Sequence, residues 1–199
     1  AFSGCSGLTS ISISASVTNI GNSAFAGCSS LTNMVLPFVG ARRGNSGTED
    51  SLFGYVFGDE SYPGAEPVTQ YYSDSLSSCF YVPSLLSTVE ITGETIFGYG
   101  AFENCSGLSS VMIPSTVNCI GRLALENTKL VKDHSEGLVI VDNCLVCCKG
   151  TCCGAVVIPE NVRLIADGAF YNCKWLTSVT IQSATTRVGA FAFEGCSML

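Results

Sequence analysis

A five-residue unit, Ala-Phe-x-x-Cys, recurs along the 199-residue chain and restricts its fold more than any other feature. Its aromatic position advances by 23 residues from Phe2 to Phe25, and again from Phe170 to Phe193. A fixed period in the twenties is typical of a solenoid, in which each repeat forms one turn and stacks on its neighbours. The copies span residues 1–5, 24–28, 101–105, 169–173 and 192–196, and residues 124–128 are a degenerate copy with Leu125 for Phe and Thr128 for Cys.

A second pattern with the same period precedes each unit. Ile11 and Ile13 lie two residues apart, so a strand turns both side chains to one face and Ser12 to the other. One such strand cannot bury its apolar face alone, and the repeats are expected to stack as a curved parallel β-sheet of short strands. Prolines, which lack the N–H that the ladder needs, end three of these strands: Pro37, Pro114 and Pro159.

Between each strand and the next unit, the pattern predicts a second inward-facing segment and a turn. Val17 and Ile20 are the apolar positions of this segment in the first complete copy. We expect tight turns at Gly21, Gly121 and Gly189. A helix of one or two turns should then carry the Ala-Phe pair, with the Phe filling the core.

Two stretches interrupt the period. Phe25 and Phe102 are 77 residues apart, which makes residues 37–85 an insertion, and Leu125 and Phe170 are 45 residues apart with a second insertion at residues 126–154. Both ends of the sequence fall inside a repeat. We therefore interpret residues 1–199 as a single repeat domain that is a fragment of a longer array.

The first insertion is acidic and rich in tyrosine. It and its flanks hold six of the seven tyrosines, and no Lys or Arg occurs between residues 45 and 100. Residues 52–58 read as a strand or a short helix. We expect Phe53, Phe57 and Phe80 to form a small core, whereas Tyr62, Tyr71 and Tyr72 are expected to be exposed because Gly, Pro, Gln and Ser flank them.

The acidic residues of this insertion do not predict a calcium site. Glu49-Asp50 and Asp59-Glu60 lack the alternating spacing of oxygen ligands in a calcium loop, so a solvated acidic loop is expected.

The second insertion alternates in polarity and predicts strands at 138–141 and 144–148 around a turn at Asp142-Asn143, followed by a repeat strand at 155–158.

Twelve cysteines raise the question of disulfides and metals. Those of the Ala-Phe-x-x-Cys units share one phase, and we expect them to be free thiols that fill the core. Five others lie within residues 144–153, but adjacent ones point to opposite faces of a hairpin, so no metal site or cofactor is expected. One cross-strand disulfide, such as Cys148–Cys152 or Cys147–Cys153, remains an alternative.

No catalytic constellation is recognisable. His134 is the only histidine and lies in a charged turn at residues 132–137, where nothing shields it or orients it. The motifs of phosphate loops, dinucleotide sites and nucleophile elbows are absent from the sequence. The net charge of −7, with Arg42-Arg43 as the only adjacent basic pair, argues against nucleic-acid binding. No run of about 18 apolar residues occurs, so membrane insertion is not expected either.

The template A-F-x-x-C-x-x-L-x-x-[VI]-x-I-P-x-x-V-x-x-I-G resembles the BspA-type leucine-rich repeat family over roughly residues 1–36 and 86–199. The resemblance implies a leucine-rich repeat solenoid in an extracellular or cell-surface protein, and some relatives act as adhesins. Residues 37–85 resemble an insertion of bacterial members, which favours a bacterial origin.

The resemblance and the absence of catalytic motifs favour a protein-binding or adhesion module, which would contact host, matrix or other cell-surface proteins. The alternatives are a structural spacer that displays another domain and, more remotely, a region of a carbohydrate-active enzyme. Tyrosine is enriched at binding hot spots, so we expect the insertion to bind the partner. Its candidate residues are Tyr55, Tyr62, Tyr71, Tyr72, Asp59 and Glu60, and the outward sheet positions Ser12, Val35, Glu90, Met112, Val157 and Thr180 rank second.

Overall fold

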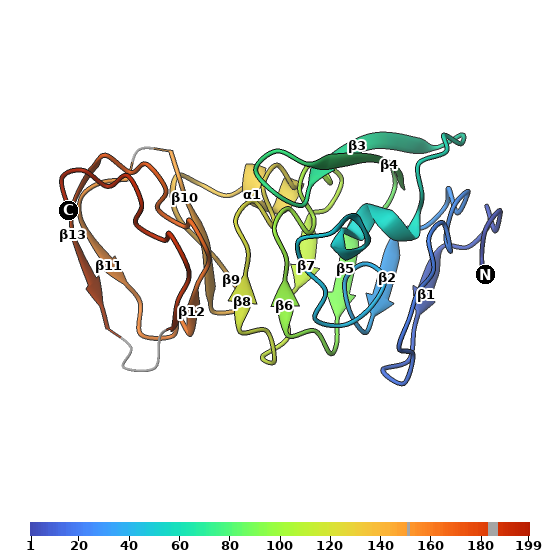
Figure 1. Cartoon of the computed structure of the whole chain (residues 1–199), viewed down its shortest axis with the longest axis horizontal. Helices are drawn as coiled ribbons and strands as arrows, with labels where there is room; N and C mark the ends of the chain where they lie inside the picture. The colour runs from blue at the N-terminus through green and yellow to red at the C-terminus, as the bar shows by residue number, and fades with distance from the viewer. Residues whose placement is uncertain (151, 183–186) are drawn as a thin grey trace. The chain divides into compact units, whose positions relative to one another are not determined.

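The computed structural model describes residues 1–150, 152–182 and 187–199. The chain is a β-solenoid of about eight turns with a period near 23 residues, as the repeat predicted. It divides into two compact units, each drawn in Figure 1. The N-terminal unit comprises Ala1–Val117 and Leu123–Asp133, and the C-terminal unit comprises Asn118–Arg122 and His134–Leu199.

A parallel sheet forms one side of the N-terminal unit (Figure 1). Ile11 pairs with Met34, Met34 with Val89 and Val89 with Val111, and the last three are buried, as a shared core requires. Neighbouring residues point outward because side chains alternate along a strand. The strands follow in the order β1 (Ser10–Ser12), β2 (Asn33–Leu36), β5 (Thr88–Ile91) and β7 (Ser110–Met112).

The Ala-Phe pairs lie in hydrogen-bonded turns, so the expected short helices are wrong. The N–H of Phe2 donates to the carbonyl of Ala24 at 2.8 Å, and that of Phe170 donates to Ala192 at 2.8 Å. These bonds run to the following turn of the solenoid instead of back along a helix. The aromatic rings of consecutive turns also stack, and the ring centroids of Phe170 and Phe193 lie 5.1 Å apart.

Left-handed backbone occurs two residues after each of these aromatic positions. Gly27 has φ of 75° and Asn104 has φ of 61°, and glycine and asparagine tolerate this region best. The glycines expected to need such freedom, at positions 21, 121 and 189, do not have positive φ. The residues two places after the six repeat positions all have positive φ: Gly4, Gly27, Asn104, Asn127, Asn172 and Gly195.

The degenerate unit starts a short α-helix, α1 (Lys129–Lys132). Thr128, which replaces the usual Cys, is its N-cap and accepts a hydrogen bond from the N–H of Val131 at 3.4 Å. The hydroxyl of Thr128 also donates to the carbonyl of Leu125 at 2.7 Å. A hydroxyl oxygen can cap a helix, whereas a thiol is a weak acceptor, so this substitution has a local structural reason.

The first insertion forms two 3₁₀ helices, η1 (Glu49–Ser51) and η2 (Phe53–Val56), and an antiparallel hairpin of β3 (Ala65–Tyr71) and β4 (Ser77–Pro83). The hairpin was not predicted. The small aromatic core is confirmed, because Phe53, Phe57 and Phe80 are each at most 1% exposed. A short strand, β6 (Ile96–Phe97), follows the resumed repeat.

The C-terminal unit contains two sheets. The first has the order β14 (Arg187–Val188), β12 (Leu164–Ile165), β10 (Cys144–Lys149) and β9 (Gly137–Val141). Its antiparallel β9–β10 hairpin turns at Asp142 and Asn143, both with positive φ, and confirms the predicted strands. The second sheet pairs β11 (Cys153–Ile158) with β13 (Trp175–Ile181) in parallel. This unit also contains β8 (Cys119–Ile120).

The repeat cysteines are free, as expected, but not all are buried. The Cys28 thiol is buried and donates to the carbonyl of Phe2 at 3.1 Å, and Cys105 is buried too. Cys5, by contrast, is exposed. Cys148 and Cys152 form a disulfide, one of the two pairings left open.

Candidate binding surfaces

One row of the second-ranked candidates lies in register on the outward face of the N-terminal unit. Ser12 pairs with Val35, Val35 with Glu90, and Glu90 with Met112. Met112 is 42% exposed, whereas Val35 and Glu90 are half-buried. The repeat template therefore predicted which residues share this row. Because the row holds small and mixed side chains, it offers little apolar area to a partner.

The outward face of β11 and β13 in the C-terminal unit is more apolar. Val157 pairs with Thr180 here, and Cys153 pairs with Trp175. A register shift after Gly154 keeps Trp175 and Thr180 on the same side of the strand, although they are an odd number of residues apart. Trp175 is 64% exposed and Val157 is 53% exposed.

Trp175, the only tryptophan, was not among the sequence candidates. It stands just before the leucine of its repeat. The equivalent positions hold Gly7, Ser30 and Gly107 in three copies but Leu130 and Met198 in two others, so the repeat carried only a weak signal for an exposed Trp here. Burying the exposed ring against a partner would remove a large apolar area from water.

The tyrosines of the insertion are less exposed than predicted. Tyr71 is 36% exposed, but Tyr55, Tyr62 and Tyr72 are half-buried. The hydroxyl of Tyr62 is buried without a hydrogen-bond partner among the described residues, and burial raises the pKa of this phenol. The expectation that Tyr62 and Tyr72 are exposed is therefore wrong.

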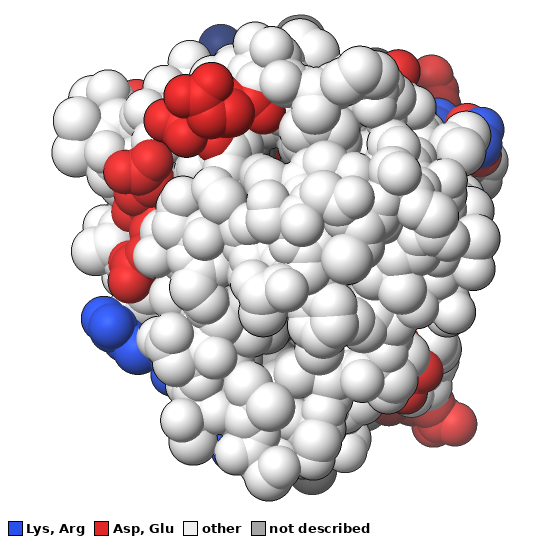
Figure 2. Space-filling model, turned by 90° about the vertical axis from the view of Figure 1, so that its right-hand side faces the viewer, with Lys and Arg blue, Asp and Glu red and all other residues white. Residues whose placement is uncertain are grey.

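The acidic pair of the insertion, Asp59 and Glu60, lies after η2 and is exposed, as expected for a solvated loop. Figure 2 shows one face of the molecule, on which uncharged side chains predominate and acidic ones lie towards the margins.

Buried polar side chains hold the hairpin of the insertion against the solenoid turn at residues 100–105. The Gln70 side chain is fully buried and accepts a hydrogen bond from the N–H of Gly54 at 2.7 Å. Its Nε2 donates to the carbonyl of Ala101 at 2.9 Å. The Glu103 carboxylate accepts the N–H of Tyr71 at 3.1 Å, so the backbone that carries Tyr71 is held in place.

No group of three or more His, Cys, Asp or Glu residues in the described part of the chain is arranged to hold a metal ion. His134 is half-buried, with Nδ1 3.1 Å from the carbonyl of Ser135, and its own carbonyl accepts a hydrogen bond from Lys149. None of the helices described there has the length and apolarity to span a bilayer.

A family of known proteins matches the repeat of this chain. The BspA type leucine-rich repeat region matches residues 1–43 and 139–199 in six copies. It leaves out residues 44–138, where β5 and β7 nevertheless continue the parallel sheet of β1 and β2. No curated protein matches the sequence.

Among solved structures, a leucine-rich repeat protein from Bacteroides ovatus is similar, with 23% identity and a TM-score of 0.39. The alignment covers 97% of this chain and 36% of that chain, so this chain spans about a third of that protein's length. The family match covers more than half of the residues, and the chain belongs to the BspA-type leucine-rich repeat family.

Proposed function

We propose that this chain is a non-enzymatic protein-binding module of a secreted or cell-surface protein, and that it contacts host, matrix or other cell-surface proteins. Support comes from the family, whose members are typically secreted or on the cell surface, and from a fold that is generally non-enzymatic. Stacked repeats form an extended surface, which suits recognition of another protein.

The observation that carries the proposal is the 64% exposure of Trp175 on the outward face of β13. Tryptophan is the residue type most enriched at the hot spots of protein interfaces. Val157 adds a second exposed apolar side chain on the adjacent strand, and Thr180, which pairs with it, supplies a hydroxyl. We therefore place the main contact surface on β11 and β13.

The insertion is the second contact surface of this proposal. Tyr71, Asp59 and Glu60 are its exposed candidates, whereas the other three tyrosines are half-buried and contribute less. An interface through the insertion would thus be smaller and more acidic than one through Trp175.

Binding of the purified chain to immobilised fibronectin, laminin and type IV collagen, and to fixed epithelial cells, tests the proposal. Biolayer interferometry should detect binding to at least one of these, and Trp175→Ala should weaken it by roughly thirtyfold, as expected of a hot spot. Leu85→Ala is the matched control, because Leu85 is 59% exposed but lies in the turn after β4.

If Trp175→Ala and Leu85→Ala changed the Kd equally, the β11–β13 surface would be excluded as the contact surface. A loss confined to Tyr71→Ala would move the contact to the insertion. If the wild-type chain bound none of the panel with a Kd below about 100 µM, the spacer interpretation would replace the binding proposal.

A further inference from the structure

Two repeat cysteines of the N-terminal unit lie beside one another in consecutive turns of the solenoid. The carbonyl of Phe2 accepts the backbone N–H of Cys5 at 3.1 Å. The same carbonyl accepts the thiol of Cys28, which comes from the next turn, at 3.1 Å. One acceptor therefore holds the backbone of Cys5 and the sulfur of Cys28 together.

The C-terminal unit repeats this arrangement with a second pair. The carbonyl of Phe170 accepts the N–H of Cys173 at 3.0 Å and the thiol of Cys196 at 3.1 Å. In both pairs the cysteines are one period of 23 residues apart in sequence, and all four thiols are free. Because the same geometry occurs in both units, it follows from the repeat and not from a local irregularity.

The backbones of the paired turns are close enough for a disulfide. The N–H of Gly4 donates to the carbonyl of Ala26 at 2.7 Å, and that of Asn172 donates to Glu194 at 2.8 Å. Strands joined by such bonds run about 4.8 Å apart, and a disulfide needs Cα atoms roughly 4.4–6.8 Å apart. Each cysteine lies within two residues of these bonds, so rotation of its side chain is the movement that brings the sulfurs together.

Cys105 occupies the same position of the repeat but has no thiol in the next turn. The carbonyl of Phe102 accepts the N–H of Cys105 at 3.1 Å, as in the two pairs. The following copy, however, holds Thr128 at the equivalent position, and its hydroxyl donates to Leu125 within its own turn. The chain thus contains a natural control for the two pairs.

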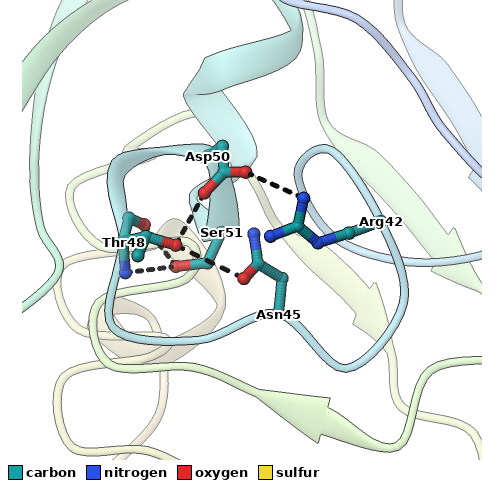
Figure 3. A network of polar contacts seen from close by, with 5 residues as sticks. All are labelled: Arg42, Asn45, Thr48, Asp50 and Ser51. Atoms are coloured by element: carbon teal, nitrogen blue, oxygen red, sulfur yellow. Dashed lines mark hydrogen bonds and ion pairs between the residues drawn. The ribbon is translucent and has the colours of Figure 1, made fainter.

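The charged groups at the start of the first insertion differ from these thiols, because close neighbours compensate them (Figure 3). The Asp50 carboxylate accepts the Thr48 hydroxyl at 2.6 Å and lies 3.7 Å from the guanidinium of Arg42. A thiol is only a weak hydrogen-bond donor, so the bonds of Cys28 and Cys196 to a carbonyl leave the sulfur free for covalent chemistry.

We propose that Cys5–Cys28 and Cys173–Cys196 are oxidation sites, at which a small-molecule disulfide such as oxidised glutathione converts two free thiols into a covalent bridge between consecutive turns. Each bridge closes a loop of one repeat, which restricts the unfolded chain and stabilises the stack of turns. The same sequence therefore has a reduced form and a braced form.

The exposed Cys5 reacts first in its pair, because burial raises the pKa of the Cys28 thiol. The Cys5 thiolate attacks one sulfur of oxidised glutathione, whose S–S bond breaks and releases one glutathione thiolate. Cys28 then loses its proton to water and attacks the Cys5 sulfur, and the second glutathione leaves. In total, two cysteine thiols lose two electrons and two protons, and oxidised glutathione takes them up as two thiols. In the second pair Cys173 reacts second, since burial raises the pKa of its thiol.

These sites go beyond the proposed contact through Trp175 and do not rest on it, because bridge formation is measured without any binding partner. Trp175→Ala should form both bridges as the wild type does. Failure to bind the matrix panel and failure to form the bridges are therefore separate outcomes.

Peptide mass spectrometry tests the proposal on the native full chain, after incubation with oxidised glutathione and alkylation of the remaining thiols in denaturant. Chymotrypsin cleaves after Phe25 and Phe193, which places the two cysteines of each pair on different peptides. Peptides joined through Cys5–Cys28 and through Cys173–Cys196 should exceed any other new cross-link by at least about tenfold, because each pair is held at high effective concentration. Cys105 should be recovered as an alkylated thiol, and the Tm of the oxidised chain should rise by about 5 °C or more.

Cys5→Ser changes an exposed side chain, and it should leave Cys28 alkylated while the Cys173–Cys196 bridge still forms. Cys79→Ser is the matched control, because it removes another exposed thiol of the same unit, on β4, and both bridges should persist. A lasting mixed disulfide between Cys5 and glutathione, with Cys28 still free, would overturn the proposal. Oxidation of Cys105 at the same rate as the pairs, cross-links scattered among the exposed thiols, or an unchanged Tm of the bridged chain would overturn it as well.

Discussion

The carboxylate of Glu94 accepts a 2.8 Å hydrogen bond from the backbone N–H of Gly44, which lies 50 residues earlier in the chain. Its second oxygen accepts the N–H of Val39, and Thr95 donates to the first at 2.7 Å. A single buried side chain thereby closes the loop after β2. The backbone N–H groups of Val39 and Gly44, at the start of the insertion, need acceptors outside the repeat, and the Glu94 carboxylate accepts both.

Glu94→Ala should lower the free energy of unfolding by about 3 kcal/mol, because it leaves buried N–H groups without an acceptor. Glu90→Ala is the control, since Glu90 is half-buried on the outward face of the adjacent β5. Urea denaturation followed by circular dichroism measures both. A Glu94→Ala variant as stable as Glu90→Ala would contradict the anchoring role of this carboxylate.

Gly27→Ala should destabilise the fold by about 1–2 kcal/mol, because it places a Cβ in left-handed backbone. Gly27 has φ of 75°, and an added Cβ would lie 3.2 Å from Cα of Gly4 in the neighbouring turn. Gly21→Ala provides the comparison: the position lacks positive φ, and an added Cβ would meet nothing within 4 Å. In thermal unfolding, the Tm of Gly21→Ala should equal or exceed that of the wild type, and the Tm of Gly27→Ala should be lower. A Tm of Gly27→Ala above that of Gly21→Ala would refute this explanation.

Glu103 should make the stability fall as the pH rises. Burial raises the pKa of its carboxyl above the ordinary 4.5, with an opposing contribution from the N–H of Tyr71 and a further rise from Glu126. The folded state therefore holds this proton more tightly than the unfolded chain. The resulting stabilisation is complete below the ordinary pKa and is lost as the pH passes the raised one.

Glu103→Gln removes this titration but keeps an oxygen that can accept the N–H of Tyr71. Unfolding free energies measured between about pH 4 and pH 7 should show the variant gaining on the wild type as the pH rises. Glu66→Gln, at an exposed position of β3, should follow the wild-type profile. Parallel profiles for Glu103→Gln and the wild type would show that burial of this carboxyl has no energetic consequence.

The cysteines should divide sharply in their reactivity with iodoacetamide. Burial raises the pKa of the Cys144 thiol to about 11 and raises that of Cys105 further, so neither forms the reactive thiolate at neutral pH. Peptide mass spectrometry should find early labelling at the exposed thiols of Cys5, Cys79 and Cys153. Cys105 and Cys144 should react only after unfolding, and early labelling of either would contradict their burial.

The same reagent tests the disulfide between Cys148 and Cys152. Alkylation of the unfolded, unreduced chain should modify the ten free cysteines, and reduction should expose two more. Twelve modified cysteines before reduction would show that this bond does not form.

The repeat predicted local structure well where two equivalent residues of consecutive copies lie 23 positions apart. Ser12 and Val35 lie exactly one period apart in sequence and are paired in the sheet. The second hairpin was also predictable, because β9 and β10 alternate in polarity around Asp142-Asn143. The short helices at the Ala-Phe pairs were predicted wrongly, because the N–H groups of Phe2, Phe102 and Phe170 bond to the next turn.

The repeat template by itself determined the solenoid, the inward apolar positions and the outward row from Ser12 to Met112, since stacking brings equivalent residues together. Only the tertiary structure decided the rest. Gln70 reaches Ala101, and Glu94 reaches Gly44, across distances in sequence that no repeat encodes. The tertiary structure also leaves most of the tyrosines of the insertion half-buried. The exposure of Trp175 likewise depends on which side of β13 the register shift leaves it.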